Sequence, residues 1–279
     1  MSFAPSREDD EYKERKDMWQ KNWETSLNDP NNFRYHTHGN ITIIRDDMFC
    51  GGTKARFLGN SLDLAYIEYV YISSLNDPDQ LAFCHAMRQL EYKGHKGKTG
   101  VIFMRNMGRF ESLSQFPYIR LGKSMGIRYI FVGPKDDLYE KASSYCDADS
   151  DNRCLLKYGL DIQEASDNLV IAMKALKQKF HHFDECWSVI NSGTLTRCLQ
   201  KAGFADAYKA VSVIGIIQDI DLCGDAQVIL HKQKHNEMIY DKHSPPFMSC
   251  PYSDAKVWQH VLSEAKQNPA KNYLFWNSS

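Results

Sequence analysis

Residues 45–56 read RDDMFCGGTKAR and lie at a turn between a predicted strand and a predicted helix. The β-branched run ITIIR (41–45) predicts the strand, and the helix is predicted to start near Lys54. Ligand sites of α/β proteins gather where strands end, and Gly51 and Gly52 allow a tight turn that brings the backbone close to a ligand. Helix N-termini disfavour cations, so their field favours the neutral, nucleophilic amine of a lysine in the first turn. The alternative is a surface lysine in a glycine turn.

Working outward from this turn, strands and helices alternate along most of the chain. The predicted strands are residues 41–45, 69–73, 99–104, 127–133, 186–190 and 210–217. The predicted helices start near Lys54 and cover residues 78–90, 116–126, 161–180, 192–203 and 255–267. This alternation predicts an α/β fold with mostly parallel sheets and helices on both faces.

Composition narrows the class of protein. The chain has 279 residues, a net charge of -1 and 43% hydrophobic residues, so no global field draws it to nucleic acid or to an anionic membrane. No apolar run approaches the ~18 residues of a membrane span, and the N-terminus has no apolar signal segment. The eight cysteines are scattered and form no CxxC pair. We therefore expect a cytoplasmic protein with mostly free thiols.

A second segment, CWSVINSGTLTRCL (186–199), runs from a strand through a turn of small residues into a helix. Backbone N–H groups of residues 191–195 and the hydroxyls of Ser192, Thr194 and Thr196 would converge at the helix N-terminus. Such a convergence predicts a phosphate site.

These two segments resemble the fold-type II pyridoxal-phosphate (PLP) enzymes, in particular the branch of aminocyclopropane-carboxylate deaminase and D-cysteine desulfhydrase. RDD followed by GGTKAR is similar to the cofactor-lysine segment, and NSGTLTR is similar to the GSGGT phosphate cup, in the same order and at a comparable interval. The resemblance implies two lobes, with Lys54 carrying PLP as a Schiff base. It also implies that Ser192, Gly193, Thr194 and Thr196 bind the cofactor phosphate. Thr53 stands where the family has Asn, and Leu195 is bulkier than its counterpart in the cup.

The resemblance extends to the loop in YVYISSLNDPDQ (69–80), where the family binds the substrate carboxylate and covers the cofactor ring. It implies substrate contacts from Ser73, Ser74 and Gln80 and a cofactor contact from Asn76. However, the family's GGxQSNH pattern is absent, and Asp77 and Asp79 make the loop acidic, which is unusual for binding a carboxylate. The alternative is a plain helix-capping turn.

Later segments carry weaker signals. In HSPPFMSCPYSD (243–254), the resemblance places Ser249, or else Cys250, at the pyridine nitrogen of the cofactor, and plain loop packing is the alternative. Arg105 follows a predicted strand and is a candidate for an anionic substrate group. No HExxH or other metal spacing is found, so no metal site is expected.

Together these features predict a PLP-dependent enzyme acting at the α carbon of an amino-acid-like substrate, as a lyase, decarboxylase or replacement enzyme. The overall pattern, including the PPFMSCPYSDAK tail, is also similar to PLP-fold proteins that bacteriophages encode beside DNA-hypermodification genes, which implies an amino-acid-modified pyrimidine of DNA as substrate. The predicted organisation is an N-terminal arm (1–40), an α/β body (41–220) and a C-terminal segment that completes the body (221–279). A homodimer is the family expectation.

Two rival functions remain open. A phosphoribosyltransferase-like enzyme would use the small-residue loop for phosphate and would need an acidic pair for a metal-bound diphosphate, with Asp219 and Asp221 as candidates. A non-catalytic binding module on the same fold would need neither PLP nor magnesium.

Overall fold

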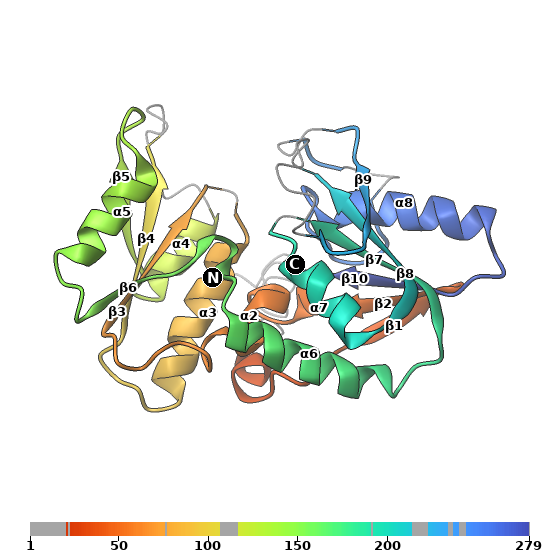
Figure 1. Cartoon of the computed structure of the whole chain (residues 1–279), viewed down its shortest axis with the longest axis horizontal. Coiled ribbons are helices and arrows are strands. Elements are labelled where there is room, and N and C mark those ends of the chain that lie inside the picture. The colour runs from red at the N-terminus through yellow and green to blue at the C-terminus, as the bar shows by residue number, and fades with distance from the viewer. Residues whose placement is uncertain are drawn as a thin grey trace, which may run out of the picture.

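The computed structural model describes residue 21 and residues 23–75, 77–106, 117–190, 192–213, 223–233, 237–239 and 244–278. Two lobes lie side by side, each built on its own sheet (Figure 1). The smaller lobe has a four-stranded sheet and the larger lobe a six-stranded sheet. Both sheets are mostly parallel and carry helices on both faces, so the predicted fold class is confirmed.

The four-stranded sheet is parallel throughout, in the order β5-β4-β3-β6. Its strands are β3 (Glu68–Ser73), β4 (Thr99–Arg105), β5 (Arg128–Val132) and β6 (Arg153–Leu155). Successive side chains of a strand point to opposite faces. Tyr69 and Tyr71 therefore pack against α3 (Asp79–Tyr92), on the face that α4 (Pro117–Ser124) also covers, while Val70 packs against α5 (Leu138–Asp147).

The six-stranded sheet has the order β1-β2-β10-β7-β8-β9 and is parallel except for the β1–β2 pair. Its strands are β1 (Tyr35–His38), β2 (Ile41–Arg45), β7 (Phe183–Ile190), β8 (Ala205–Ser212), β9 (Gln227–Leu230) and β10 (Tyr273–Asn277). Ile44 and Trp276 face α6 (Gln163–Lys177) and α7 (Thr194–Ala202). Ile43 and Phe275 face α8 (Asp254–Gln267) on the other side.

Helix α2 (Gly52–Leu58) lies between the lobes (Figure 1). Its Ala55 and Leu58 belong to the core under α3, and its Phe57 belongs to the core under α6. Because β2, β10 and β7 are parallel, the residues that follow them meet at one edge of the large sheet. This edge and the segment that follows β3 line one cleft, which is where α/β proteins bind ligands.

The structure adds one helix, α5, and four strands, β1, β6, β9 and β10, that the sequence did not predict. Helix α5 and the three-residue β6 flank residues 148–152, which form a turn inside the smaller lobe. The larger omission is β10, which lies between β2 and β7 although it is the last strand in the chain.

The first described residues contact both lobes, and β10 lies within the larger sheet. Within the predicted arm, residues 23–28 are helical and Trp23 packs edge-on against His85 with ring centroids 5.1 Å apart, while β1 pairs with β2. The proposed boundaries at residues 40 and 220 stay a prediction. Among the described helices, none combines the length and the apolar character needed to span a bilayer.

Candidate active site

Lys54 is held at the start of α2 by a turn of two glycines. Gly51 and Gly52 have φ values of +86° and +70°, which only glycine adopts without strain. A Cβ atom on Gly51 would lie 2.7 Å from the Cβ of Ala55 and 3.0 Å from the carbonyl oxygen of Leu81. The glycine therefore allows α2 and α3 to approach closely, and this approach directs Lys54 toward the start of α3.

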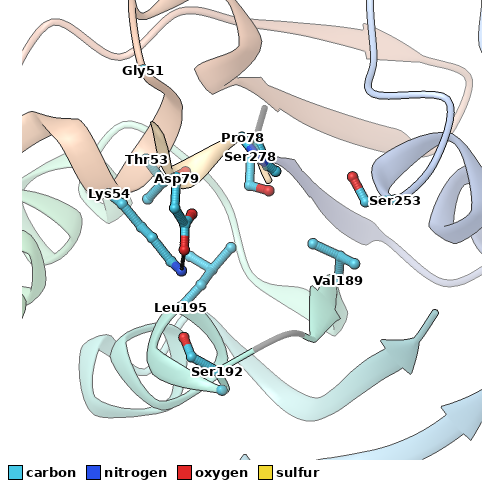
Figure 2. A pocket seen from close by; sticks show the side chains of 11 residues that line it. Gly51, Thr53, Lys54, Pro78, Asp79, Val189, Ser192, Leu195, Ser253 and Ser278 are labelled. Atoms are coloured by element: carbon cyan, nitrogen blue, oxygen red, sulfur yellow. Dashed lines mark hydrogen bonds and ion pairs between the residues drawn. The ribbon is translucent and has the colours of Figure 1, made fainter. Parts of the chain in front are cut away.

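The side chain of Lys54 lies in the cleft between the lobes and forms an ion pair with Asp79 at the start of α3 (Figure 2). Both side chains are largely shielded, with 20% and 14% of their surfaces exposed. The cleft is lined by Gly51, Thr53, Lys54, Pro78, Asp79, Val189, Ser192, Gly193, Leu195, Ser253 and Ser278. The cleft has a volume of about 50 Å³, room for a few water molecules.

Two residues of the segment around Lys54 form a buried ion pair. Asp46 and Arg56 are 0% and 1% exposed, and the guanidinium donates to Oδ1 of Asp46 from Nη2 at 2.5 Å and from Nε at 3.2 Å. Oδ2 of Asp46 accepts from the hydroxyl of Thr53 at 2.7 Å and from the indole of Trp276 at 2.9 Å. The Thr53 hydroxyl thus anchors the start of α2 to Asp46, which explains why a threonine stands at this position.

A second network involves the predicted cofactor contact Ser249. Arg45 donates twice to Asp47, at 2.7 and 2.6 Å, and Asn277 donates to Asp47 at 2.7 Å. The hydroxyl of Ser249 donates to the amide oxygen of Asn277 at 2.7 Å, and Ser249 does not line the cleft. Its assignment to the pyridine nitrogen stays a prediction, and Ser253 is the serine of this segment that reaches the cleft.

The predicted phosphate loop faces Lys54 from the other wall of the cleft (Figure 2). Gly193 precedes α7 with φ +74°, and the hydroxyls of Ser192 and Thr194 lie 3.2 Å apart. Thr196 points elsewhere: it is 1% exposed and its hydroxyl pairs with that of Ser188 at 3.0 Å. The structure therefore brings Ser192 and Gly193 to the cleft, whereas Thr196 links α7 to β7.

Gly159, which was not singled out in the sequence, joins the two motifs. It has φ +71°, and a Cβ atom there would lie 2.7 Å from Cβ of Ser192 and 3.6 Å from Nζ of Lys54. The amine of Lys54 and the phosphate loop thus approach the same glycine. Arg197 also lies at this loop and donates to Asp161 at 2.9 Å and to the carbonyl of Ser192 at 3.3 Å. In the sequence, Gly159 lies between Tyr158 and Leu160 and belongs to no motif, so nothing there indicated that it contacts both segments.

The acidic loop before α3 is internally bonded. Asp77 accepts hydrogen bonds from the hydroxyls of Ser73 at 2.9 Å and Tyr71 at 3.3 Å and from the backbone N–H of Asp79 at 3.0 Å. Burial, and secondly the nearby carboxylate of Asp79, raise the pKa of Asp77 to about 6. The hydroxyl of Ser73 is thus bound to Asp77, and Ser73 does not line the cleft.

The remaining predicted contacts are distributed as follows. The side chain of Gln80 is buried and donates to the carbonyl of Ser74 at 2.6 Å, so it stabilises the loop. Arg105 is exposed at the end of β4, donates to the carbonyl of Pro134 at 2.7 Å and does not line the cleft. Asn76 lies outside the described residues, as do Asp219 and Asp221 of the rival phosphate-sugar function. All of these assignments stay predictions.

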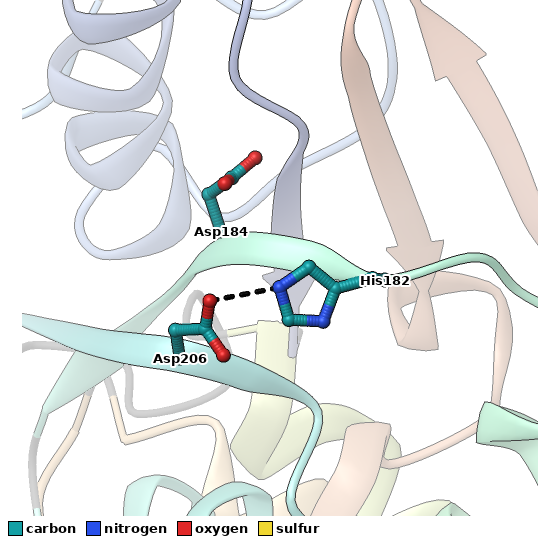
Figure 3. A group of neighbouring side chains, drawn as sticks. All are labelled: His182, Asp184 and Asp206. Carbon is teal, nitrogen blue, oxygen red and sulfur yellow. Dashed lines mark hydrogen bonds and ion pairs between the residues drawn. The ribbon is translucent and has the colours of Figure 1, made fainter.

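The structure also brings two neighbouring residues and a third, distant one together as possible metal ligands (Figure 3). His182 and Asp184 from the start of β7 meet Asp206 of β8, with ligand atoms within 4.8 Å of one another and His182 bonded to Asp206 at 2.8 Å. This group lies at the amino ends of the strands, away from Lys54. His182 and Asp206 are 63% and 71% exposed, and exposed groups of this kind are common without an ion.

Solved structures of other proteins identify the fold of this chain. No protein-family model and no curated protein sequence matches the chain. Solved structures do: an ACC deaminase homologue superposes with a TM-score of 0.64 over 86% of this chain and 84% of its own, at 13% identity. The chain has the fold of the fold-type II PLP enzymes.

Two further structures agree. Threonine deaminase isoform 2 from Solanum lycopersicum matches with a TM-score of 0.63 over 94% of this chain and 89% of its own, at 11% identity. A pyridoxal 5'-phosphate-dependent aspartate racemase matches with a TM-score of 0.61 over 94% of both chains, at 8% identity. At these sequence identities the structural similarity shows the fold, and it does not show which reaction the cleft supports.

Proposed function

We propose that this protein is a PLP-dependent enzyme that acts at the α carbon of an amino-acid-like substrate, with Lys54 as the cofactor lysine. One observation carries the proposal: the amine of Lys54 and the phosphate loop before α7 both lie close to Gly159, and both line one cleft at the carboxyl ends of the strands. The fold supports the same conclusion, since structures with this fold include PLP-dependent enzymes.

The donor groups of the cleft fit the cofactor. A lysine amine can bind an aldehyde covalently, and a helix N-terminus with hydroxyl groups binds phosphate. Lys54 would therefore hold the aldehyde carbon, and Ser192, Gly193 and Thr194 the phosphate. The predicted cofactor contacts of Asn76 and Ser249 stay predictions, and Thr196 is left out of the phosphate site because its buried hydroxyl pairs with that of Ser188.

PLP, when bound, supplies an electron sink for a carbanion next to the substrate amine. The chain supplies the acid–base groups. Lys54, as a neutral amine, would take the proton from the α carbon at Nζ, and the ammonium so formed would pair with Asp79, its partner in this structure. Val189 and Leu195 add apolar walls that exclude water from the reacting atoms. Elimination and replacement start from this proton transfer, whereas decarboxylation starts from loss of the substrate carboxylate.

A narrower substrate proposal is an amino acid carried on a pyrimidine of bacteriophage DNA. Its support is the likeness of the PPFMSCPYSDAK tail to phage-encoded PLP-fold proteins. A second candidate function is a binding module without chemistry. The ion pair between Lys54 and Asp79 favours it, because a lysine paired with a carboxylate also serves as a purely structural contact.

The test is covalent attachment of the cofactor. After incubation with PLP, we expect a visible absorption band that borohydride abolishes, with the reduced label mapped by peptide analysis to Lys54. Lys54→Gln should lose the band, whereas Lys141→Gln, on the exposed surface of α5, should retain it. A colourless protein, or a label spread over several surface lysines, would sink the PLP mechanism and leave the binding module.

A further inference from the structure

The N-terminus of α3 faces Lys54 across the cleft, yet it has no backbone donor left for an anion. Pro78 lacks an N–H group. The N–H of Asp79 donates to the carboxylate of Asp77 at 3.0 Å. The N–H groups of Gln80 and Leu81 donate to the carbonyls of Asp77 at 3.2 Å and Pro78 at 2.9 Å. The helix end that would otherwise attract a carboxylate is therefore capped by the chain itself.

The same wall of the cleft is negatively charged. Asp79 reaches the cleft directly, and Asp77 lies behind it, supported by hydroxyl donors from Ser73 and Tyr71. Among the described residues that line the cleft, Lys54 is the one cation, and it already pairs with Asp79. A substrate carboxylate placed here would meet two like charges without a cation of its own, which is unfavourable.

The hydroxyl groups of the opposite wall are also engaged. Ser253 donates to Oδ2 of Asp254 at 3.1 Å, and Ser278 donates to Oδ1 of the same residue at 2.9 Å. The N-terminus of α7, with Ser192, is the remaining donor site in the described lining, and the proposed function assigns it to the cofactor phosphate. No described side chain of the lining is thus left to receive a free carboxylate.

We propose that the substrate is an amine whose neighbouring carboxyl group is tied up as an amide, an inference that rests on the proposed function. An amide N–H donates a hydrogen bond to Asp79, where a carboxylate is repelled, and an amide carries no charge that needs a cation in the cleft. The class includes amino-acid amides and larger molecules that carry an amino acid through an amide bond.

The test compares matched ligands on the PLP-loaded protein. Glycinamide is compared with glycine, and L-alaninamide with L-alanine, by titrating the change in the visible band and, independently, by the rise in Tm. We expect each amide to bind at least tenfold more tightly than its acid. Asp79→Asn should bring the two affinities within about threefold, whereas Asp151→Asn, the same charge change at an exposed turn, should leave the ratio unchanged.

The outcomes separate the two proposals. If PLP labels Lys54 but the acids bind as tightly as the amides, or if neither ligand binds, the substrate inference fails while the cofactor assignment stands. If the amide preference survives Asp79→Asn, the acidic wall does not cause it and the inference also fails. If PLP does not label Lys54, the proposed function fails and the inference falls with it.

Discussion

Replacing Asp46 by Asn should destabilise the protein more than any other single change of a carboxylate to an amide outside the cleft. Asp46 is 0% exposed and is the counter-ion of Arg56, which is 1% exposed. Removing one partner of a buried pair costs about 3–5 kcal/mol, because the other charge stays buried without compensation. Arg56 would keep its hydrogen bond to the carbonyl of Pro30 at 2.7 Å and its place over the rings of Phe33 and Phe49, at 3.8 and 4.2 Å. These contacts offset part of the loss, so we expect about 3 kcal/mol, the lower end of this range.

The assay is urea unfolding followed by tryptophan fluorescence. With an m value of about 3 kcal/mol/M, a loss of ~3 kcal/mol moves the midpoint down by roughly 1 M at unchanged m. The control is Glu91→Gln, which breaks the ion pair with Arg88 on the surface of α3, where the side chains are 43% and 60% exposed. Exposed pairs contribute about 1 kcal/mol or less. If Asp46→Asn costs no more than Glu91→Gln, the buried pair does not hold α2 in place and the reasoning is wrong.

Two further predictions concern the cleft. Burial and the carboxylate of Asp79 raise the pKa of Asp77 from 3.8 to about 6. Between pH 4 and 6 the folded protein therefore keeps a proton that the unfolded chain releases, and its stability falls as the pH rises. Asp77→Asn should remove this fall and raise Tm at pH 7 relative to wild type, and equal pH profiles of the two proteins would contradict the prediction. Gly159→Ala should lower Tm and weaken PLP attachment at least tenfold, because its Cβ would lie 2.7 Å from Ser192 at φ +71°. Gly94→Ala is its control, with φ +88° but open space around the new atom, and should lower Tm without affecting PLP.

The sequence predicted the fold class because the motifs and the hydrophobic periods are local. The turn at Gly51 and Gly52 is visible as two adjacent letters, and the strand before it as a β-branched run. Strand order is not local. The run YLFWN (273–277) is apolar enough for a strand, but nothing near it in the chain indicates that it pairs with β2 and β7. The short β6 has three residues and no alternating pattern to detect.

The site was predicted in part for the same reason. Lys54 and Ser192 were identified because each lies in a motif, and the structure brings both to one cleft. Ser278 and Gly159 were missed, since their roles arise only from contacts between segments far apart in the chain. The sequence indicated both the acidic loop before α3 and Lys54, but not that Asp79 pairs with Lys54, because an ion pair across 25 positions has no signature in a single sequence.

The position of β10 has a consequence for how the protein is made. During synthesis, β2 and β7 leave the ribosome long before residues 273–277, so each presents an unpaired edge to the surroundings until β10 has emerged. The carbonyl of Ser278 then receives the N–H of Thr53, next to Lys54. Residues 273–278 therefore close both the large sheet and the cleft, and a nascent chain that still lacks them cannot hold the complete cleft.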